Sequence, residues 1–164
     1  MRKASVKDLS CESFSKYGTF ARMVEPKCEK IGEEPVEFFR DMAQLDLGGR
    51  GIASFSTCRV CKRPPMVDVT EFHDNCGEGI LPLDADVLIH VAPATAAGEV
   101  PLEKIEVFRV PKGTFVALNP GVWHHAPFAE NADVANVLIV LPERTYAVDC
   151  HVSEIAEQDR VEFG

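Results

Sequence analysis

Short runs of apolar and β-branched residues recur along the chain. They cover residues 51–57, 66–73, 79–83, 86–92, 105–110, 114–118 and 135–141. Eleven glycines and eleven prolines are spread through the sequence and mark turns between the runs. Short strands at regular spacing with turn signals between them are typical of a β-sandwich or a β-barrel. The pattern therefore predicts an all-β fold.

Helical patterns are sparse. A helix is expected within residues 6–17, with Ser10 or Cys11 near its start and Gly18 as its stop. Residues 35–42 fit either a strand or a short helix, and residues 151–158 suggest a terminal helical turn. Any helices should therefore be short and peripheral.

The composition indicates a globular protein. Hydrophobic residues make up 46% of the 164 residues and charged residues 26%, so we expect one domain over residues 1–164. A net charge of −9 disfavours binding to nucleic acid or to an anionic membrane. No apolar run approaches the roughly 20 residues of a membrane span, and the basic start lacks the apolar stretch of a secretory signal. We expect a cytoplasmic protein with reduced cysteines.

Metal-binding residue types gather in two segments. Alternation in residues 66–73 places Glu71 and His73 on one face of a strand. The turn at 74–77, rich in Asp, Asn and Gly, can fold the chain back as a hairpin and bring Glu78 across from His73. In the second segment, a strand runs into an Asn-Pro-Gly turn that His124 follows. Two imidazoles and two carboxylates suit a divalent ion such as zinc, nickel, manganese or iron.

These segments resemble the two motifs of the cupin superfamily. Glu71 stands at the first histidine position of the first motif, His73 at the second, and Glu78 at the glutamate. The second motif is matched in register by Gly113, Gly121 and His124. The sequence departs from the family pattern at four other motif positions, which hold Pro65, Ala85, Asn119 and Phe128. The resemblance implies a jelly roll, the double-stranded β-helix, with a metal held by Glu71, His73, Glu78 and His124.

Three segments are more narrowly similar to the ureidoglycolate lyase family. They are a Leu-x-x-x-x-Phe-x-x-Tyr-Gly element at residues 9–18, a Glu-x-His…Glu-x-x-x-Pro block at 71–82, and Trp-His-His at 123–125. Glu78 stands where that family has glutamine. The likeness implies a nickel or zinc ion, with manganese or iron also compatible, and a homodimer. It also implies cleavage of ureidoglycolate, a small hydroxy acid, to glyoxylate and urea.

The resemblance implies roles for further residues. Cleavage needs a proton to leave the substrate hydroxyl and a proton to reach the departing urea nitrogen, and Glu78 and His125 are the candidates for this transfer. Arg59 could clamp the substrate carboxylate, because the family also places an arginine there. Trp123 is expected to be a core residue or a wall of the substrate pocket rather than a chemical group.

Other interpretations of the sequence stay open. The chain could be a different metallocupin enzyme, such as a sugar or keto-acid isomerase or a dioxygenase, or a binding module for a small acid. Cys58 and Cys61 form a CxxC pair, but a strand sends residues three apart to opposite faces, so we expect a coincidence rather than a zinc site.

Overall fold

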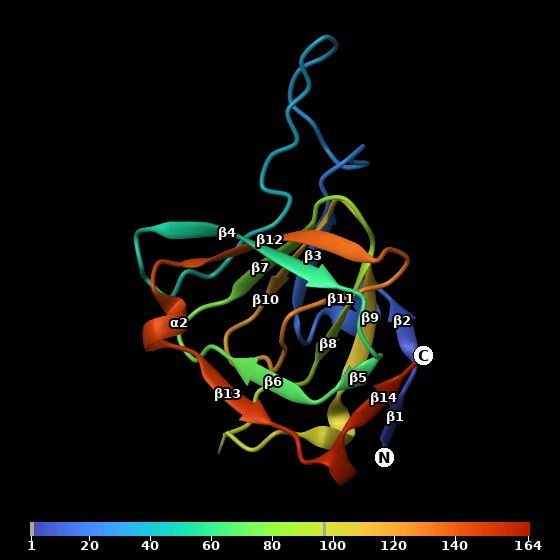
Figure 1. The fold of residues 1–164 in the computed structure, drawn as a ribbon. Helices are drawn as coiled ribbons and strands as arrows, with labels where there is room; N and C mark the ends of the chain where they lie inside the picture. The colour runs from blue at the N-terminus through green and yellow to red at the C-terminus, as the bar shows by residue number, and fades with distance from the viewer. Residues whose placement is uncertain (1, 97) are drawn as a thin grey trace.

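The fold consists almost entirely of β-strands (Figure 1). The computed structural model describes residues 2–96 and 98–164. The largest sheet has the order β3 (Gly18–Arg22), β10 (Thr114–Leu118), β7 (Glu78–Pro82), β12 (Val134–Pro142) and β4 (Ala53–Cys61). A four-stranded sheet has the order β11 (Phe128–Ala129), β8 (Val87–Val91), β9 (Glu106–Val110) and β2 (Val6–Asp8). Side chains from both sheets share one core cluster, so the two sheets pack face to face.

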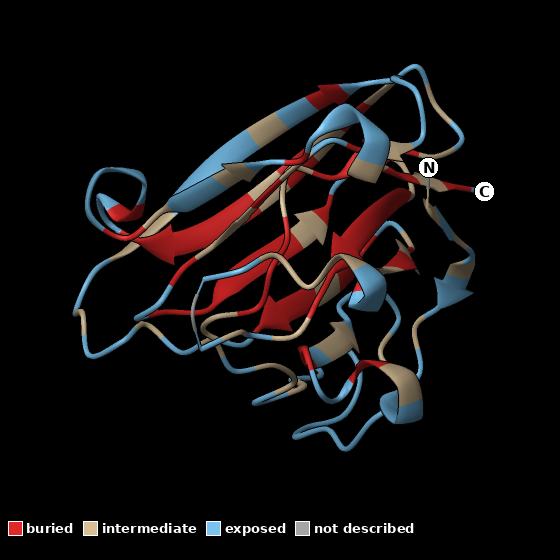
Figure 2. Cartoon of the chain, turned by 90° about the horizontal axis from the view of Figure 1, so that it is seen from below, coloured by how far each residue is buried: buried red, intermediate tan, exposed pale blue. Residues whose placement is uncertain are grey.

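Two smaller sheets complete the structure. One has the order β1 (Arg2–Ala4), β14 (Val161–Phe163) and β5 (Met66–Val67), and the other pairs β13 (His151–Glu154) with β6 (Val69–Phe72). A second core cluster, which includes Leu88, Trp123 and Phe163, joins these sheets to the four-stranded one. Buried strands occupy the interior, and exposed residues gather in the loops, in the helices and along one long outer strand (Figure 2). The prediction of an all-β jelly roll is confirmed.

The helices are short, as expected. Helix α1 spans Cys11–Phe14, and the Ser10 hydroxyl caps it by accepting a hydrogen bond from the Ser13 amide. Helix α2 spans Thr145–Val148, and two 3₁₀ turns cover Leu102–Lys104 and Glu157–Asp159. No helix among the described residues is long and apolar enough to cross a membrane.

Two sequence expectations differ from the structure. The terminal helical turn expected at 151–158 is wrong for its first half, because residues 151–154 form β13 and pair antiparallel with β6. The single strand expected at 66–73 divides at Asp68 into β5 and β6, which join different sheets. In both cases a partner strand distant in sequence decides the local conformation, which local periodicity does not report.

Residues 23–52 form a long connection that rises from one end of the barrel (blue to cyan in Figure 1). Residues 35–42, left open between strand and helix, form neither, apart from an isolated bridge between Phe38 and Ile31. The side chains of Ile31, Val36 and Phe38 are 54%, 73% and 61% exposed. The connection therefore presents apolar side chains to solvent.

Phe14 anchors helix α1 in the first core cluster, and this role predicts a stability difference. Its ring is fully buried and packs edge-on against Tyr17, Phe20 and Phe108. Replacing it with alanine should lower the free energy of unfolding by about 3–5 kcal/mol, because a large cavity is left. Phe55, 69% exposed on β4, is the matched control. Replacing it with alanine should lower the free energy of unfolding by less than about 0.5 kcal/mol. Urea denaturation measures both, and equal losses would contradict the packing described here.

Candidate metal centre

The four expected ligand residues converge from three parts of the chain. Glu71 lies on β6, His73 follows it, and Glu78 begins β7. His124 is brought alongside by backbone hydrogen bonds with Glu71, from the Glu71 amide to the His124 carbonyl at 2.6 Å and back at 2.8 Å. The turn at 74–77 places Glu78 beside His73 as expected, although β6 and β7 belong to different sheets rather than to one hairpin.

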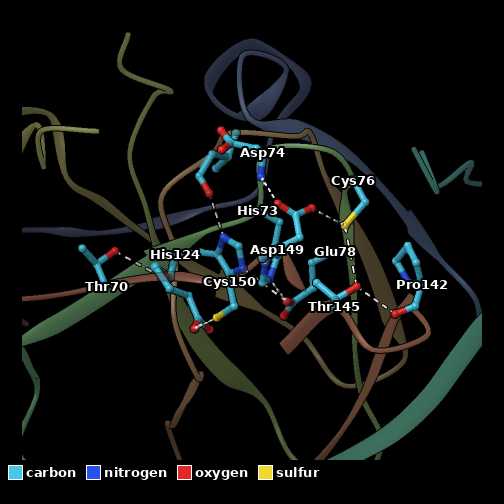
Figure 3. A network of polar contacts seen from close by, with 12 residues as sticks. Thr70, His73, Asp74, Cys76, Glu78, His124, Pro142, Thr145, Asp149 and Cys150 are labelled. Atoms are coloured by element: carbon cyan, nitrogen blue, oxygen red, sulfur yellow. Dashed lines mark hydrogen bonds and ion pairs between the residues drawn. The ribbon is translucent and has the colours of Figure 1, made fainter. Parts of the chain in front are cut away.

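The side-chain distances suit a single ion. Glu78 Oε2 lies 3.1 Å from His73 Nε2 and 3.2 Å from His124 Nε2 (Figure 3). Glu71, His73 and His124 offer ligand atoms that all lie within 4.8 Å of one another. Nitrogen and oxygen ligands bind a transition metal at about 2.0–2.2 Å, so neighbouring ligands lie about 3 Å apart. His73, Glu78 and His124 are all buried, which keeps water from competing for their ligand atoms.

The outer nitrogens of both imidazoles are committed to backbone carbonyls. His73 Nδ1 donates to the Asp149 carbonyl at 2.6 Å, and His124 Nδ1 donates to the Val122 carbonyl at 2.8 Å. A carbonyl can only accept, so each Nδ1 carries the proton. Each Nε2 then faces Glu78 with a lone pair, unless the ring takes up a second proton. Two lone pairs and a carboxylate directed at one point repel one another, and a divalent cation removes that repulsion. The donor set therefore fits a metal ion.

Without a metal, the same contacts shift the pKa values of the group. Burial raises the pKa of Glu78, but the charges and hydrogen bonds of His124 and His73 outweigh it and bring that pKa to about 2. Burial lowers the pKa of His124. The charge of Glu78 and the hydrogen bond to it, together with the hydrogen bond to the Val122 carbonyl and the charge of Glu71, outweigh burial, so the pKa is raised. The carboxylate thus stays ionised, and the site attracts positive charge.

The other expected site residues, His125, Trp123 and Arg59, differ in burial and in the residues that they contact. His125 follows His124 and is half-buried; burial lowers its pKa, and nearby Glu71 opposes the shift. Trp123 is 1% exposed in the second core cluster, where it packs against Phe72 and donates to Thr95 Oγ1. Arg59 is exposed, and its guanidinium lies 3.6 Å from Cys61 Sγ. His125 is near enough to Glu71 for that carboxylate to act on its pKa, while the contacts of Arg59 and Trp123 described above are with other residues.

Arg63 was missed by the sequence analysis. Its guanidinium donates to the carbonyls of Ala126 and Pro127 at 2.7 and 3.2 Å and lies over the Phe128 ring. Burial lowers its pKa, and its charge in turn helps to lower the pKa of His125. Arg63 thus supplies positive charge near His125. The position of Arg63 in the sequence did not indicate a place near the site. Its contacts with Ala126 and Pro127 depend on how the loop after His125 folds.

A buried polar chain behind His124 was also missed. His90, 1% exposed on β8, directs Nε2 at Thr70 Oγ1 at 3.1 Å, and the Thr70 hydroxyl donates to the His124 carbonyl at 3.1 Å. Since that hydroxyl proton is used, Thr70 accepts from His90, whose pKa burial lowers well below its usual value. His90 is therefore a neutral ring that supports the backbone of a ligand residue.

The six cysteines, all within the described chain, are free. Cys58 packs against the first core cluster from β4, while Cys61 on the same strand is exposed. A second group, Asp74, Asp149 and His151, also offers ligand atoms within 4.8 Å of one another, but Asp74 and His151 are exposed.

A comparison of the sequence with models of known protein families identifies the family of this chain. A family model described as ureidoglycolate lyase matches residues 1–162. The chain belongs to the ureidoglycolate lyase family. No protein of curated function matches the sequence.

Solved structures similar to this member of the ureidoglycolate lyase family are distant in sequence. Peruvianin-I, a cysteine peptidase from Thevetia peruviana latex, is 10% identical with a TM-score of 0.47, over 63% of this chain and 57% of that one. An oxalate decarboxylase mutant from Bacillus subtilis is 13% identical with a TM-score of 0.43, over 82% and 31%. A 4-keto-6-deoxy sugar epimerase from Streptomyces spheroides is 20% identical with a TM-score of 0.41, over 62% and 50%. Each match spans less than two thirds of the other chain.

The contacts of Glu78 predict how stability depends on pH in the metal-free protein. The folded pKa of Glu78, about 2, lies below the unfolded value of 4.5, so its stabilisation is present above pH 4.5 and is lost as the pH falls toward 2. The folded pKa of His124 lies above 6.5, so its stabilisation is present below pH 6.5 and is lost as the pH rises through the folded pKa. The difference in unfolding free energy between the native protein and Glu78→Gln should therefore be largest between about pH 4.5 and 6.5.

Urea denaturation in the presence of a chelator, repeated across this pH range, measures that difference. A difference that stays constant from pH 3 to pH 8 would show that Glu78 is not ion-paired with the two imidazoles.

Proposed function

We propose that this chain is a metal-dependent lyase that cleaves ureidoglycolate, or a close small hydroxy-acid analogue, to glyoxylate and urea. The observation that carries the proposal is the buried convergence of His73, His124 and Glu78 with Glu71, in a chain whose family is that of ureidoglycolate lyase. The substrate bears a carboxylate, a hydroxyl and a ureido group on one carbon. Its carboxylate and hydroxyl oxygens can bind a cation, and its negative charge can bind an arginine.

Glu71, His73, Glu78 and His124 would hold the divalent ion, with nickel or zinc our first choices and manganese or iron the alternatives. When bound, such an ion supplies positive charge that lowers the pKa of a coordinated hydroxyl and orients the bond to be broken. Three of the four side chains, His73, Glu78 and His124, are buried. The chain's own residues must then provide the proton transfers.

His125 and Glu78 are the proposed proton-transfer groups. One proton leaves the substrate hydroxyl as the carbonyl of glyoxylate forms, the carbon–nitrogen bond breaks, and one proton reaches the urea nitrogen. The lowered pKa of His125 keeps its ring neutral near pH 7, so the ring can accept the first proton and return it to the nitrogen. Glu78 is ionised over the same range and offers a second acceptor.

Arg63 replaces Arg59 as our candidate for binding the substrate carboxylate. Arg59 is exposed on β4, between Cys58 and Val60, which face the core. Arg63 is also exposed, but its guanidinium is held by two backbone carbonyls, and its charge helps to lower the pKa of His125. A fixed guanidinium beside the proton-transfer histidine suits a substrate whose carboxylate is adjacent to the reacting carbon. Trp123 would act through packing, as a wall behind the ligand strand.

We also propose that the chain forms a single domain and acts as a cytoplasmic homodimer. Six free thiols suit a reducing compartment. The exposed apolar side chains of Ile31, Val36 and Phe38 offer a contact surface on the 23–52 connection. Sedimentation equilibrium measures the oligomeric state directly.

The proposed reaction is tested with purified protein loaded with one metal at a time. Urea and glyoxylate should appear in equal amounts from ureidoglycolate, and His73→Ala or His124→Ala should lower metal affinity and turnover by more than about 100-fold. That estimate follows because even residues that only support ligands cost 10–100-fold. His151→Gln is the matched control, since His151 is half-exposed and outside the proposed ligand set.

Metal bound with no turnover above background would remove the substrate assignment. Full metal binding in both alanine variants would show that the ligand set is wrong, and loss of metal in His151→Gln would place the ion in the Asp74–Asp149–His151 group instead.

A further inference from the structure

Residues Asp149 and Cys150 lie directly behind the metal centre, in the short link between α2 and β13 (Figure 3). The link contacts the side chains of two proposed ligands, His73 and Glu71, and the turn that leads to a third, Glu78. It contributes no proposed ligand itself. It lies more than 70 positions beyond those ligands in sequence, so its contacts close the site from the C-terminal part of the chain.

Asp149 acts on His73 and on the turn that leads to Glu78. Its carbonyl accepts the Nδ1 proton of His73. Its carboxylate accepts hydrogen bonds from the Asp74 amide at 2.9 Å and from the Asn75 amide and side chain at 3.0 and 3.2 Å. The residue is 2% exposed, and Cys76 Sγ lies 3.7 Å from the same carboxylate. One buried side chain thus ties down the turn between two ligands.

Cys150 acts on the third ligand. Its thiol donates to Glu71 Oε2 at 3.1 Å. A carboxylate oxygen of an ionised side chain can only accept, so the sulfur supplies the proton of this hydrogen bond. The adjoining strand β13 pairs Val152 with Glu71, which holds the backbone of the same residue. The Glu71 carboxylate is therefore oriented by both the side chain and the strand that follow Asp149.

We propose that Asp149 and Cys150 are positioning residues for the metal centre: Asp149 sets the tautomer of His73 and the approach of Glu78, and Cys150 sets the orientation of the Glu71 carboxylate. The inference rests on the proposed function, since it concerns the same metal site. Ligands that are held before binding lose less conformational entropy when the ion arrives, so metal affinity depends on these outer contacts.

Cys150 permits a sharp test, because serine keeps a hydrogen-bond donor at the same place and alanine removes it. The probe is cobalt(II), whose visible absorption reports on its coordination. We expect Cys150→Ala to weaken cobalt affinity by about 10–100-fold and to change the visible spectrum, and Cys150→Ser to restore both. Cys11→Ala, at an exposed cysteine on α1, is the matched control and should bind as the native protein does.

Asp149→Ala should weaken cobalt affinity by a similar factor and broaden the spectrum, because the 74–77 turn loses its anchor. Thr145→Val is its control: Thr145 is 1% exposed in the preceding helix, and its hydroxyl donates to the Pro142 carbonyl at 2.8 Å, with only a long contact of 4.0 Å to Cys76 Sγ in the turn. The control should lower the melting temperature and leave cobalt affinity and spectrum unchanged. If Asp149→Ala fails to fold, the Cys150 pair decides the matter.

Native affinity in Cys150→Ala would overturn the role of Cys150. Native affinity in a folded Asp149→Ala would overturn the role of the Asp149 carboxylate in holding the turn that leads to Glu78, since alanine keeps the backbone carbonyl that faces His73. Equal weakening in Cys150→Ala and Cys150→Ser would overturn positioning by hydrogen bond, since sulfur itself would then be needed. Failure of the native protein to bind any cobalt would overturn the metal centre and this inference together. Normal cobalt binding without lyase turnover would count against the proposed reaction alone, with the comparison of variants still deciding the inference.

Discussion

The structure depends on one buried carboxylate that two imidazoles approach from different segments of the chain. Glu78 Oε2 lies within 3.2 Å of Nε2 of both His73 and His124, and all three side chains are almost completely buried. Burying these groups is costly unless positive charge is shared among them. Because both outer ring nitrogens already donate to backbone carbonyls, that charge must come from extra protons or from a metal ion.

The jelly roll provides the rigid elements that make this convergence possible. β7, which carries Glu78, lies in the middle of the five-stranded sheet and pairs on both sides, with β10 and with β12. β6, which carries Glu71, belongs to a separate two-stranded sheet that the C-terminal strand β13 completes. The site therefore forms where two sheets meet, and its assembly requires the last quarter of the chain to dock.

The proposed chemistry follows from the difference between the inner and outer parts of the site. The inner part, formed by imidazole nitrogens and carboxylate oxygens, suits a divalent cation. The outer part, with half-buried His125 and with Arg63 held by two carbonyls, suits proton transfer and recognition of a carboxylate. The proposed substrate, a small hydroxy acid, has groups that match both parts. The membership of the chain in the ureidoglycolate lyase family agrees with this division of roles.

The sequence by itself determined the strand pattern and a short helix that begins near Ser10 or Cys11, because alternation and capping are local rules. Strand alternation and turn chemistry also predicted that Glu78 would lie near His73, whereas the place of His124 in the ligand set came from the resemblance to the cupin motifs. The sequence could not predict β13 in place of a helical turn, or the contacts of Asp149 and Cys150. The contact of Asp149 joins residues that are separated by 76 positions in the sequence, and the contact of Cys150 joins residues separated by 79. Only tertiary packing decided them, since no local period or spacing relates residues that meet when separate sheets dock.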